Sequence, residues 1–578
     1  MRIGKKQSDL FSHPYILLIL GCLLVYIAFP QGNSENILKI RSIVCLTAPL
    51  AAAAVWQFFL YCKKWTKKGQ KPDPPLITIK ICLVICILCL IFLFWHSPYQ
   101  LEMLASVILL VLGAIALWAH IFNHLTPRLA CILLGAAAFS LHAVYILYTA
   151  YLVRQHDVMD IQSSIGHQAY MLYFVNHNFA LPNFDPRSVW EFYHPPLHYW
   201  VSALWIKLQM LFGTDPATAV ENVQYLTLFY SCAALIISYR ILRILQFDGA
   251  ALIVSFAILC FHPSLILLSG SINNDMLGIV LSFAAILYAL RWYQNPTRKN
   301  ILLLALWIGL SMMAKSSGIL AAPAVAFLFL RKFLKAKDSR LIFWKQFGLF
   351  LAVSIPLGLW WSIYCKIRFG MPIGAVTGLQ PDNPQYLGHD SPIQRLFGMD
   401  WHHFSVFENW NWQDGVFEYN LWIALLKTAL FDEAELFVSG PGLIFSQMLF
   451  WVNALLTAGM LVCIILSVVY AWRKQAPIKT CQAGFRPFTL FFTVLFVTYL
   501  LFYIGFCFRE PYACTQNFRY IVPTLLPAAA AQGAVLKHNR LQPSQKSKAL
   551  TWTITLLSTA FCILSAFVYL LAGCSTAL

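Results

Sequence analysis

Residues 448–472, MLFWVNALLTAGMLVCIILSVVYAW, contain no charged side chain and are followed directly by Arg473 and Lys474. A helix of this length rises far enough to cross the ~30 Å hydrocarbon core of a bilayer. Similar apolar runs recur along the whole chain, which predicts an all-α polytopic membrane protein. A β-barrel is not expected, because its strands would appear as weakly alternating segments of about ten residues.

The overall composition supports this fold class. Of the 578 residues, 60% are hydrophobic and only 11% are charged, whereas soluble domains are about 25% charged. These values argue against a soluble enzyme, a nucleic-acid-binding protein and a disordered chain. The formal net charge of +18 does not indicate polyanion binding, because Lys and Arg in the short loops of a membrane protein report orientation.

The apolar runs define about fifteen candidate spans, so we expect about 13–15 transmembrane helices. With the N-terminus inside, the basic clusters that follow the spans fall on one side, as the positive-inside rule requires. Residues 195–212 would reverse this pattern if they crossed the membrane, so we expect an interfacial or re-entrant helix there. The candidate spans are 14–30, 43–62, 78–95, 100–121, 129–151, 218–245, 249–269, 275–292, 300–314, 317–331, 343–365, 448–472, 487–508, 518–536 and 549–572.

Two long loops, 152–217 and 367–447, lie on the outer face in this topology, and we expect the chemistry there. The second loop ends in residues 415–437, which we expect to form an amphipathic helix on the membrane surface. The topology predicts a multi-pass protein of the cell (plasma) membrane, with a cytoplasmic N-terminus and the active site on the outer or periplasmic face. Residues 1–128 are expected to be an accessory block of four helices, and residues 129–572 the membrane core.

The first outer loop is unusually rich in polar side chains. Any one of them fits an ordinary solvated loop, but four prolines, at 182, 186, 195 and 196, restrict the backbone around them, and the set as a whole predicts a functional site. Asp157 directly follows a span, a position suited to a general base at the membrane surface. The polar residues are His156, Asp157, Asp160, His167, Asp185, Arg187, Glu191, His194 and His198.

Several motifs in this loop resemble the first periplasmic loop of GT-C superfamily glycosyltransferases. They are the Asp after a span, GHQAY at 166–170, LPNFDP at 181–186 and YHPPLHYW at 193–200. The likeness is greatest to the protein O-mannosyltransferase-like branch, which includes the lipid A aminoarabinose transferases. Later segments resemble the same branch in family order, from about residue 129 to 536: SINNDML at 271–277, MAKSSG at 313–318, LLKTALFDE at 425–433 and QNFRYIVP at 516–523.

The resemblance implies a GT-C fold, with interfacial helices in the first core loop and a large second outer loop. It also implies an inverting transfer of a hexosyl or pentosyl group. The donor would be a polyprenyl (or dolichyl) phosphate sugar, and the acceptor a protein, lipid or envelope-glycan hydroxyl on the outer face. Asp157 matches the base of the family by position, although this chain has His-Asp where the aminoarabinose transferases have Asp-Glu. The chain has no inside domain large enough to bind a nucleotide, and a lipid-linked donor needs none.

The candidates for binding the donor phosphate are Lys315, Arg519, Tyr520 and His194. Lys315 interrupts an apolar stretch, which is costly unless the lysine pairs, faces a wet cavity or snorkels to the interface. Arg519 and Tyr520 open a helix from the outside, where a guanidinium can hold a phosphate. His194 and His198 have the i, i+4 spacing that places two side chains on one helix face, so they could bind a divalent metal or phosphate, or simply pack at the interface.

The remaining candidates are weaker. Asp275 follows two asparagines and would also fit an ordinary helix N-terminus. The others are His156, His167, His198 and Glu191.

Two other classes of protein compete with the enzyme. A transporter or flippase would also have many spans, but it usually shows inverted repeats and broken helices at the membrane midplane, and we find no repeat. A lipid-linked glycan polymerase would also use a large outer loop, but it gives no reason for an Asp after a span followed by HPPL. The expected partners are the lipid-linked donor, the acceptor and membrane lipids, without nucleic acid.

Overall fold

The computed structural model describes residues 100–336, 340–375, 379–400, 410–411, 415–433, 436–437, 440–472 and 482–573. The predicted spans 14–30, 43–62 and 78–95 lie outside the described residues. The proposed division of the chain at residue 128 therefore stays a prediction.

The described chain is almost entirely helical, apart from one two-stranded antiparallel pairing of β1 (Trp410–Asn411) with β2 (Val416–Phe417). The elements up to the middle of the chain are α4 (Gln100–Ile121), α5 (Pro127–Tyr148), α6 (His167–Asn176), η2 (Pro186–Ser188), α7 (Leu197–Leu211), α8 (Pro216–Glu221), α9 (Val223–Ile244), α10 (Gly249–Phe261), α11 (Pro263–Gly270) and α12 (Asp275–Gln294). The later elements are α13 (Arg298–Ala314), η3 (Ser316–Ala321), α14 (Ala322–Lys335), α15 (Arg340–Phe369), α16 (Pro392–Phe397), α18 (Leu421–Phe431), α19 (Gly440–Trp472), α20 (Gln482–Arg509), η4 (Ala513–Gln516), η5 (Phe518–Thr524), α21 (Leu525–Leu541) and α22 (Gln545–Gly573).

Within this part of the chain, nine helices are long and apolar enough to cross a membrane, or ten if the bent pair α10–α11 is one span. The pair bends by 43° at Pro263, because proline lacks the N–H that would continue the helix. Two further predicted spans, 300–314 and 518–536, correspond to α13 and to η5 with α21; α13 and α21 have 17 residues each. The all-helical, polytopic prediction is confirmed.

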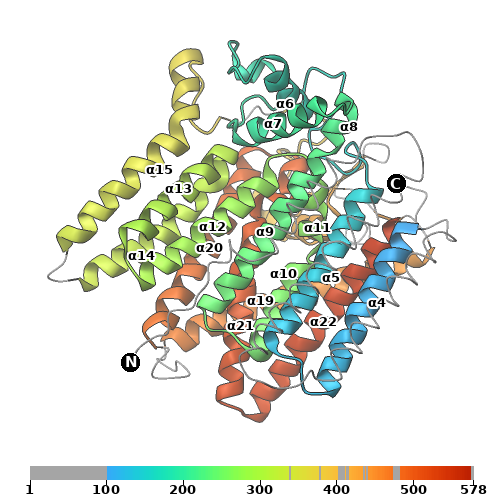
Figure 1. Cartoon of the computed structure of the whole chain (residues 1–578), viewed down its shortest axis with the longest axis vertical. Coiled ribbons are helices and arrows are strands. Elements are labelled where there is room, and N and C mark those ends of the chain that lie inside the picture. Colours follow the sequence, from blue (N-terminus) through green and yellow to red (C-terminus); the bar gives the residue numbers. More distant parts are fainter. Residues whose placement is uncertain are drawn as a thin grey trace, which may run out of the picture.

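Helix α12 is the most buried of these spans. The buried share of its apolar stretch is 89%, against 22% for α15. In Figure 1, α13, α14 and α15 lie on one side of the bundle, and α4, α5 and α22 on the other, with α9 and α12 between them. The first residue of α12, Asp275, is therefore held at the end of a central helix rather than at the lipid-facing rim.

The polar first loop forms a separate helical group. Helices α6, α7 and α8 lie together at one end of the bundle (Figure 1). Helix α7 has 15 residues, too few to be counted among the spans, as expected for residues 195–212. It is fastened to the bundle by hydrogen bonds from the indole of Trp205 to the Asn222 carbonyl (2.8 Å) and between His198 Nε2 and the Ile272 carbonyl (2.8 Å).

The expectation of a surface helix within residues 415–437 is wrong. Helix α18 is buried among α11, α19 and η5. Its Lys427 is fully buried and donates to the equally buried Glu418 carboxylate at 2.7 Å. Hydropathy does not distinguish a helix on the membrane surface from one buried in the bundle. A short apolar helix with one lysine has the same hydropathy whether the lysine extends to the membrane interface or pairs with a buried carboxylate.

Replacing Lys427 by Met should destabilise the protein by about 3–5 kcal/mol, because it leaves the Glu418 carboxylate buried without a counter-charge. Thermal unfolding of the detergent-solubilised protein measures this effect. The double variant K427M/E418Q should recover much of the loss, while K345Q, at an exposed lysine on α15, should change little. A melting temperature for K427M equal to that of the wild type would contradict the buried ion pair.

Candidate functional site

The ends of four chain segments bring charged side chains together at one end of the bundle. Asp157 lies in the loop after α5, and Asp275 is the first residue of α12. Lys315 follows the last residue of α13, and Arg519 lies in η5, just before α21. We call these four residues the ionic cluster. The most distant members, Asp157 and Arg519, are more than 350 residues apart in sequence. All four residues were predicted as site candidates from the sequence.

Arg519 lies between the two carboxylates of the ionic cluster. Its Nη2 is 3.7 Å from Asp157 Oδ2, and its Nη1 is 3.6 Å from Asp275 Oδ2. Lys315 pairs directly with the other Asp275 oxygen. Tyr520 completes the group, since its hydroxyl accepts from Arg519 Nη2 at 3.0 Å and its ring lies beneath both cations, 5.1 Å from Lys315 Nζ and 4.9 Å from Arg519 Cζ.

The two carboxylates of the ionic cluster have different surroundings. The Asp275 side chain is 2% exposed and faces both cations, whereas the Asp157 side chain is 29% exposed and has only the longer contact with Arg519. A carboxylate that is buried and paired on both sides holds cations in place. A more accessible carboxylate can accept a proton from an incoming group.

Local backbone geometry fixes the position of Asp157. The residue has a left-handed φ of 57°, and its carbonyl accepts from the His167 amide at 2.9 Å. Gly166 makes this closure possible, because it has φ +94° and a Cβ there would lie 2.7 Å from the Asp157 carbonyl oxygen. The glycine of the GHQAY motif is therefore required by a close backbone approach and by a conformation that L-residues rarely adopt.

A second glycine explains the MAKSSG element around Lys315. After α13 ends, η3 folds back so closely that a Cβ on Gly318 would lie 2.4 Å from Ser311 Oγ. Asn274 ties the same point to α12 by donating to the Ala314 carbonyl at 3.0 Å. Lys315 is thus held at the level of the α12 N-terminus, where Asp275 also complements the helix dipole.

The first loop contributes a second group, the His–Glu–His cluster of His167, Glu191 and His194. Glu191 Oε2 is 2.8 Å from His194 Nε2 and 3.4 Å from His167 Nε2. All three offer one ligand atom within 4.8 Å of the others. On its other side, His167 Nδ1 is 2.7 Å from the Tyr199 hydroxyl.

The chemistry of the His–Glu–His cluster fits a divalent metal. Burial, with the nearby His194, holds the pKa of His167 well below its ordinary value, and a neutral imidazole is the form that binds metal. When Nδ1 carries the proton and donates to Tyr199, the Nε2 lone pair points toward the Glu191 carboxylate. The Nε2 lone pair of His167 and the Glu191 carboxylate are both acceptors, so a cation between them would stabilise their contact. The hydrogen bond of His167 with Tyr199 resembles the bonds that orient metal-bound histidines.

A third group, around His156, has a different character. Nε2 of His156 is 2.8 Å from Asp432 Oδ1, and its Nδ1 is 3.4 Å from Glu433 Oε1. Burial and Arg519 lower the pKa of His156, but the two carboxylates outweigh them and raise it above its ordinary value. With a carboxylate at each nitrogen, the residue is best described as a charged imidazolium in an ion pair. His156, Asp432 and Glu433 also offer ligand atoms within 4.8 Å of one another, but the raised pKa of His156 favours the protonated form, which does not bind a metal.

The predicted pairing of His194 with His198 is wrong. Helix α7 begins at Leu197, so His194 lies before it, separated by Pro195 and Pro196, and the i, i+4 argument does not apply. The His198 side chain is buried and bonds the Ile272 carbonyl, and it does not supply a ligand atom to the His–Glu–His cluster. The N-terminus of α12 is also arranged differently from an aspartate cap: Asn273 Oδ1 accepts from the Asp275 amide at 3.0 Å, which leaves the Asp275 carboxylate for Lys315.

Asp432 and Glu433 were not identified from the sequence. They end the segment LLKTALFDE, and the side chain of Asn517, from the QNFRYIVP segment, donates to Asp432 at 2.7 Å and to Glu433 at 3.2 Å. An acidic pair at the end of an apolar helix was the available signal. It was missed because the helix was expected on the membrane surface, where such charges are ordinary.

Comparison with known proteins supports the resemblance stated from the sequence. Residues 193–360 match a family described as dolichyl-phosphate-mannose-protein mannosyltransferase. The predicted resemblance to the protein O-mannosyltransferase-like branch is confirmed over these residues, and the match indicates a membrane glycosyltransferase. No match to this chain was found among curated proteins.

The solved structures that are similar to this chain include two that match over 76% of both chains. One is ArnT from Cupriavidus metallidurans bound to undecaprenyl phosphate, with a TM-score of 0.42 and 12% sequence identity. The other is ArnT from the same organism in the apo state, with a TM-score of 0.40 and 13% identity.

The His156 ion pair predicts a pH-dependent stability. A histidine whose folded pKa is raised stabilises the fold fully below its unfolded pKa of about 6.5, and this contribution is lost as the pH rises through the folded value. The substitution H156Q should therefore lower the melting temperature more at pH 6 than at pH 9. An equal loss at both pH values would show that His156 is not charged in the folded protein.

Proposed function

Given the match of residues 193–360 to the mannosyltransferase family, we propose that this protein is an inverting glycosyltransferase. It transfers a hexosyl or pentosyl group from a polyprenyl (or dolichyl) phosphate donor to a hydroxyl of a protein, lipid or envelope glycan. The proposal depends on the ionic cluster, in which a partly exposed carboxylate, Asp157, faces Arg519, and the Nε of Arg519 is a buried donor without a partner among the described residues.

Asp157 is the general base. It is the more exposed carboxylate of the ionic cluster, so an acceptor hydroxyl can approach it. One oxygen of Asp157 takes the hydroxyl proton while the acceptor oxygen bonds to the anomeric carbon. The bond from that carbon to the donor phosphate breaks on the opposite face, and the phosphate leaves with the electron pair. A single displacement of this kind inverts the anomeric configuration.

Arg519 and Lys315 stabilise the departing phosphate. Both ion pairs of Arg519 with carboxylates are longer than 3.5 Å, so its donors are not used up by hydrogen bonds to them. Its Nε is buried and has no hydrogen-bond partner among the described residues. A buried donor without a partner is costly, and a phosphate oxygen would satisfy it. The ring of Tyr520 makes cation–π contacts with both Lys315 and Arg519.

The His–Glu–His cluster holds a divalent metal ion beside this site. His194 and His167 supply nitrogen ligands and Glu191 a carboxylate oxygen, a set that suits Zn²⁺. When bound, the metal supplies positive charge that favours a phosphate leaving group. Asp157 raises the pKa of His167 and Arg519 lowers it. The charges of the ionic cluster are therefore close enough to influence the His–Glu–His cluster.

The chemistry takes place on the outer face of the cell membrane, with the N-terminus in the cytoplasm. This orientation rests on the basic loops, which all fall at the opposite side when the spans are counted. The polar groups of α6, of the loop before α7 and of the ionic cluster then face the outside.

Replacing Asp157 by Asn should reduce sugar transfer at least about 100-fold, because the amide cannot take the acceptor proton. The assay is transfer from a radiolabelled polyprenyl phosphate sugar by purified protein of equal melting temperature. The control is D160N, which removes an exposed carboxylate from the same loop and should leave the rate unchanged. Full activity of D157N would rule out Asp157 as the base.

The metal site is tested without an activity measurement. Protein purified without chelator should contain about one Zn²⁺ or similar ion per chain by elemental mass spectrometry. H194Q and E191Q should each lower that content strongly, because two ligands hold the ion less tightly than three. H156Q should not lower it, since His156 forms the separate ion pair. Equal metal content in H194Q and wild type would overturn the assignment.

A further inference from the structure

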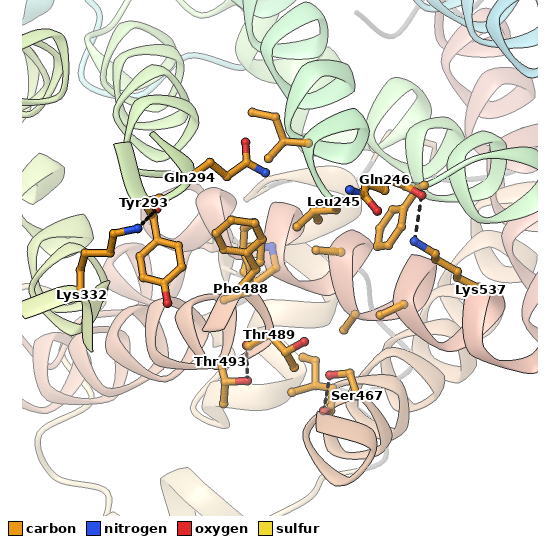
Figure 2. Close-up of a pocket in the computed structure, with 18 of the residues that line it drawn as sticks. Leu245, Gln246, Tyr293, Gln294, Lys332, Ser467, Phe488, Thr489, Thr493 and Lys537 are labelled. Carbon is orange, nitrogen blue, oxygen red and sulfur yellow. Dashed lines mark hydrogen bonds between the residues drawn. The ribbon is translucent and has the colours of Figure 1, made fainter. Parts of the chain in front are cut away.

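A cavity lies at the end of the bundle opposite to the ionic cluster. Its volume is about 600 Å³, and it is formed where α9, α12, α14, α15, α19, α20 and α21 meet. Figure 2 shows Phe488 near its centre, with Lys332 on one side and Lys537 on the other. This cavity has no part in the proposed sugar transfer.

The length of α12 separates this cavity from the ionic cluster. Asp275 begins the helix, and Tyr293 and Gln294 at its last residues line the cavity. A helix of 20 residues is about 30 Å long, which is also the thickness of the hydrocarbon core. The cavity therefore lies near the opposite membrane surface. Two of its lining residues, Lys335 and Gln294, are exposed, and we call this part of the lining its mouth.

The cavity wall is mostly apolar. Phe488 and Phe492 come from α20, Phe343 from α15 and a row of alanines from α21. Helix–helix contacts in a bundle are normally filled with side chains. A cavity of this size between seven helices has room for an apolar chain, and an isolated inorganic ion gains nothing from such a wall.

Three lysines stand around this apolar wall: Lys332, Lys335 and Lys537. Lys332 Nζ donates to the Tyr293 carbonyl at 2.8 Å, and Lys537 Nζ donates to the Gln246 carbonyl at 3.0 Å (Figure 2). An ammonium has three N–H donors, so the bond to a helix-end carbonyl orients Lys332 without using all of its donors. Among the described residues that line the cavity, none is acidic.

We propose that this cavity binds an anionic phospholipid of the surrounding bilayer. The headgroup phosphate lies at the mouth, near Lys335 and Lys332, and an acyl chain lies along Phe488 and Phe492. Basic pockets between transmembrane helices are suited to anionic lipid headgroups, and the apolar wall requires an amphiphile rather than free phosphate. The lipid fills the space between α12 and α14 on one side and α19 to α21 on the other.

The test uses the full-length protein in neutral detergent, with phosphatidylglycerol as the probe. Native mass spectrometry measures bound lipid, and thermal unfolding measures stabilisation. Phosphatidylglycerol should bind and raise the melting temperature, as a ligand of the folded state does. Phosphatidylcholine and inorganic phosphate should do neither. If phosphatidylcholine stabilises equally, the headgroup assignment fails, and if phosphate alone stabilises equally, the lipid assignment fails.

Variants locate the binding within the protein. K335Q, at the exposed last residue of α14, should weaken phosphatidylglycerol binding about fivefold, which corresponds to about 1 kcal/mol for one lysine near an anionic headgroup. A531F, which adds a ring inside the cavity, should abolish the response without loss of the fold. K345Q, on α15 outside the cavity lining, is the matched control. Unchanged binding in both K335Q and A531F would overturn the proposal.

Discussion

The arrangement of the bundle depends on the need to pair charges that are buried between its helices. An isolated ionised group there costs several kcal/mol, so it persists only beside a counter-charge or water. Asp275 starts the most buried span of the described chain, and Lys315 and Arg519 face its two oxygens. Because these residues stand at the ends of α12, α13 and η5, their pairing sets how far those elements extend relative to one another.

This pairing also leaves the ionic cluster prepared for a further anion. Its two cations and two carboxylates balance formally, but the pairing is uneven, since Lys315 and Asp275 satisfy each other while Arg519 is only loosely held by Asp157. In the proposed reaction, the leaving phosphate would meet a guanidinium that is already oriented by its hydrogen bond to Tyr520. Preorganisation of this kind reduces the rearrangement that must accompany charge development.

The sequence predicted the parts of this protein that follow from local chemistry. Apolar length predicted the described spans, and the cost of a charge at membrane depth identified Lys315 before its partner was known. What failed depended on tertiary contacts. The choice between a surface and a buried position for α18 is made by Glu418, which pairs with Lys427.

Histidine roles failed for a similar reason. The spacing of His194 and His198 assumed one helix, but two prolines delay the helix start to Leu197. Glu191, the partner of His194, lies only three residues before it and reaches it across a turn with a left-handed residue, Glu191 itself. Asp432, the partner of His156, is 276 residues away in sequence and meets it only in the folded chain.

The amide of His167 links Asp157, the proposed base, to the start of α6. That amide donates to the carbonyl of Asp157, and the His167 side chain belongs to the cluster with Glu191 and His194. The position of the base is thus set by α6, outside the spanning helices, whereas Arg519 and Lys315 stand on the bundle itself. A molecule that shifts α6 on binding would move the proton acceptor relative to fixed cations. In the proposed reaction, a shift of α6 would therefore change the distance between the base and the departing phosphate, without moving the two cations that bind the phosphate.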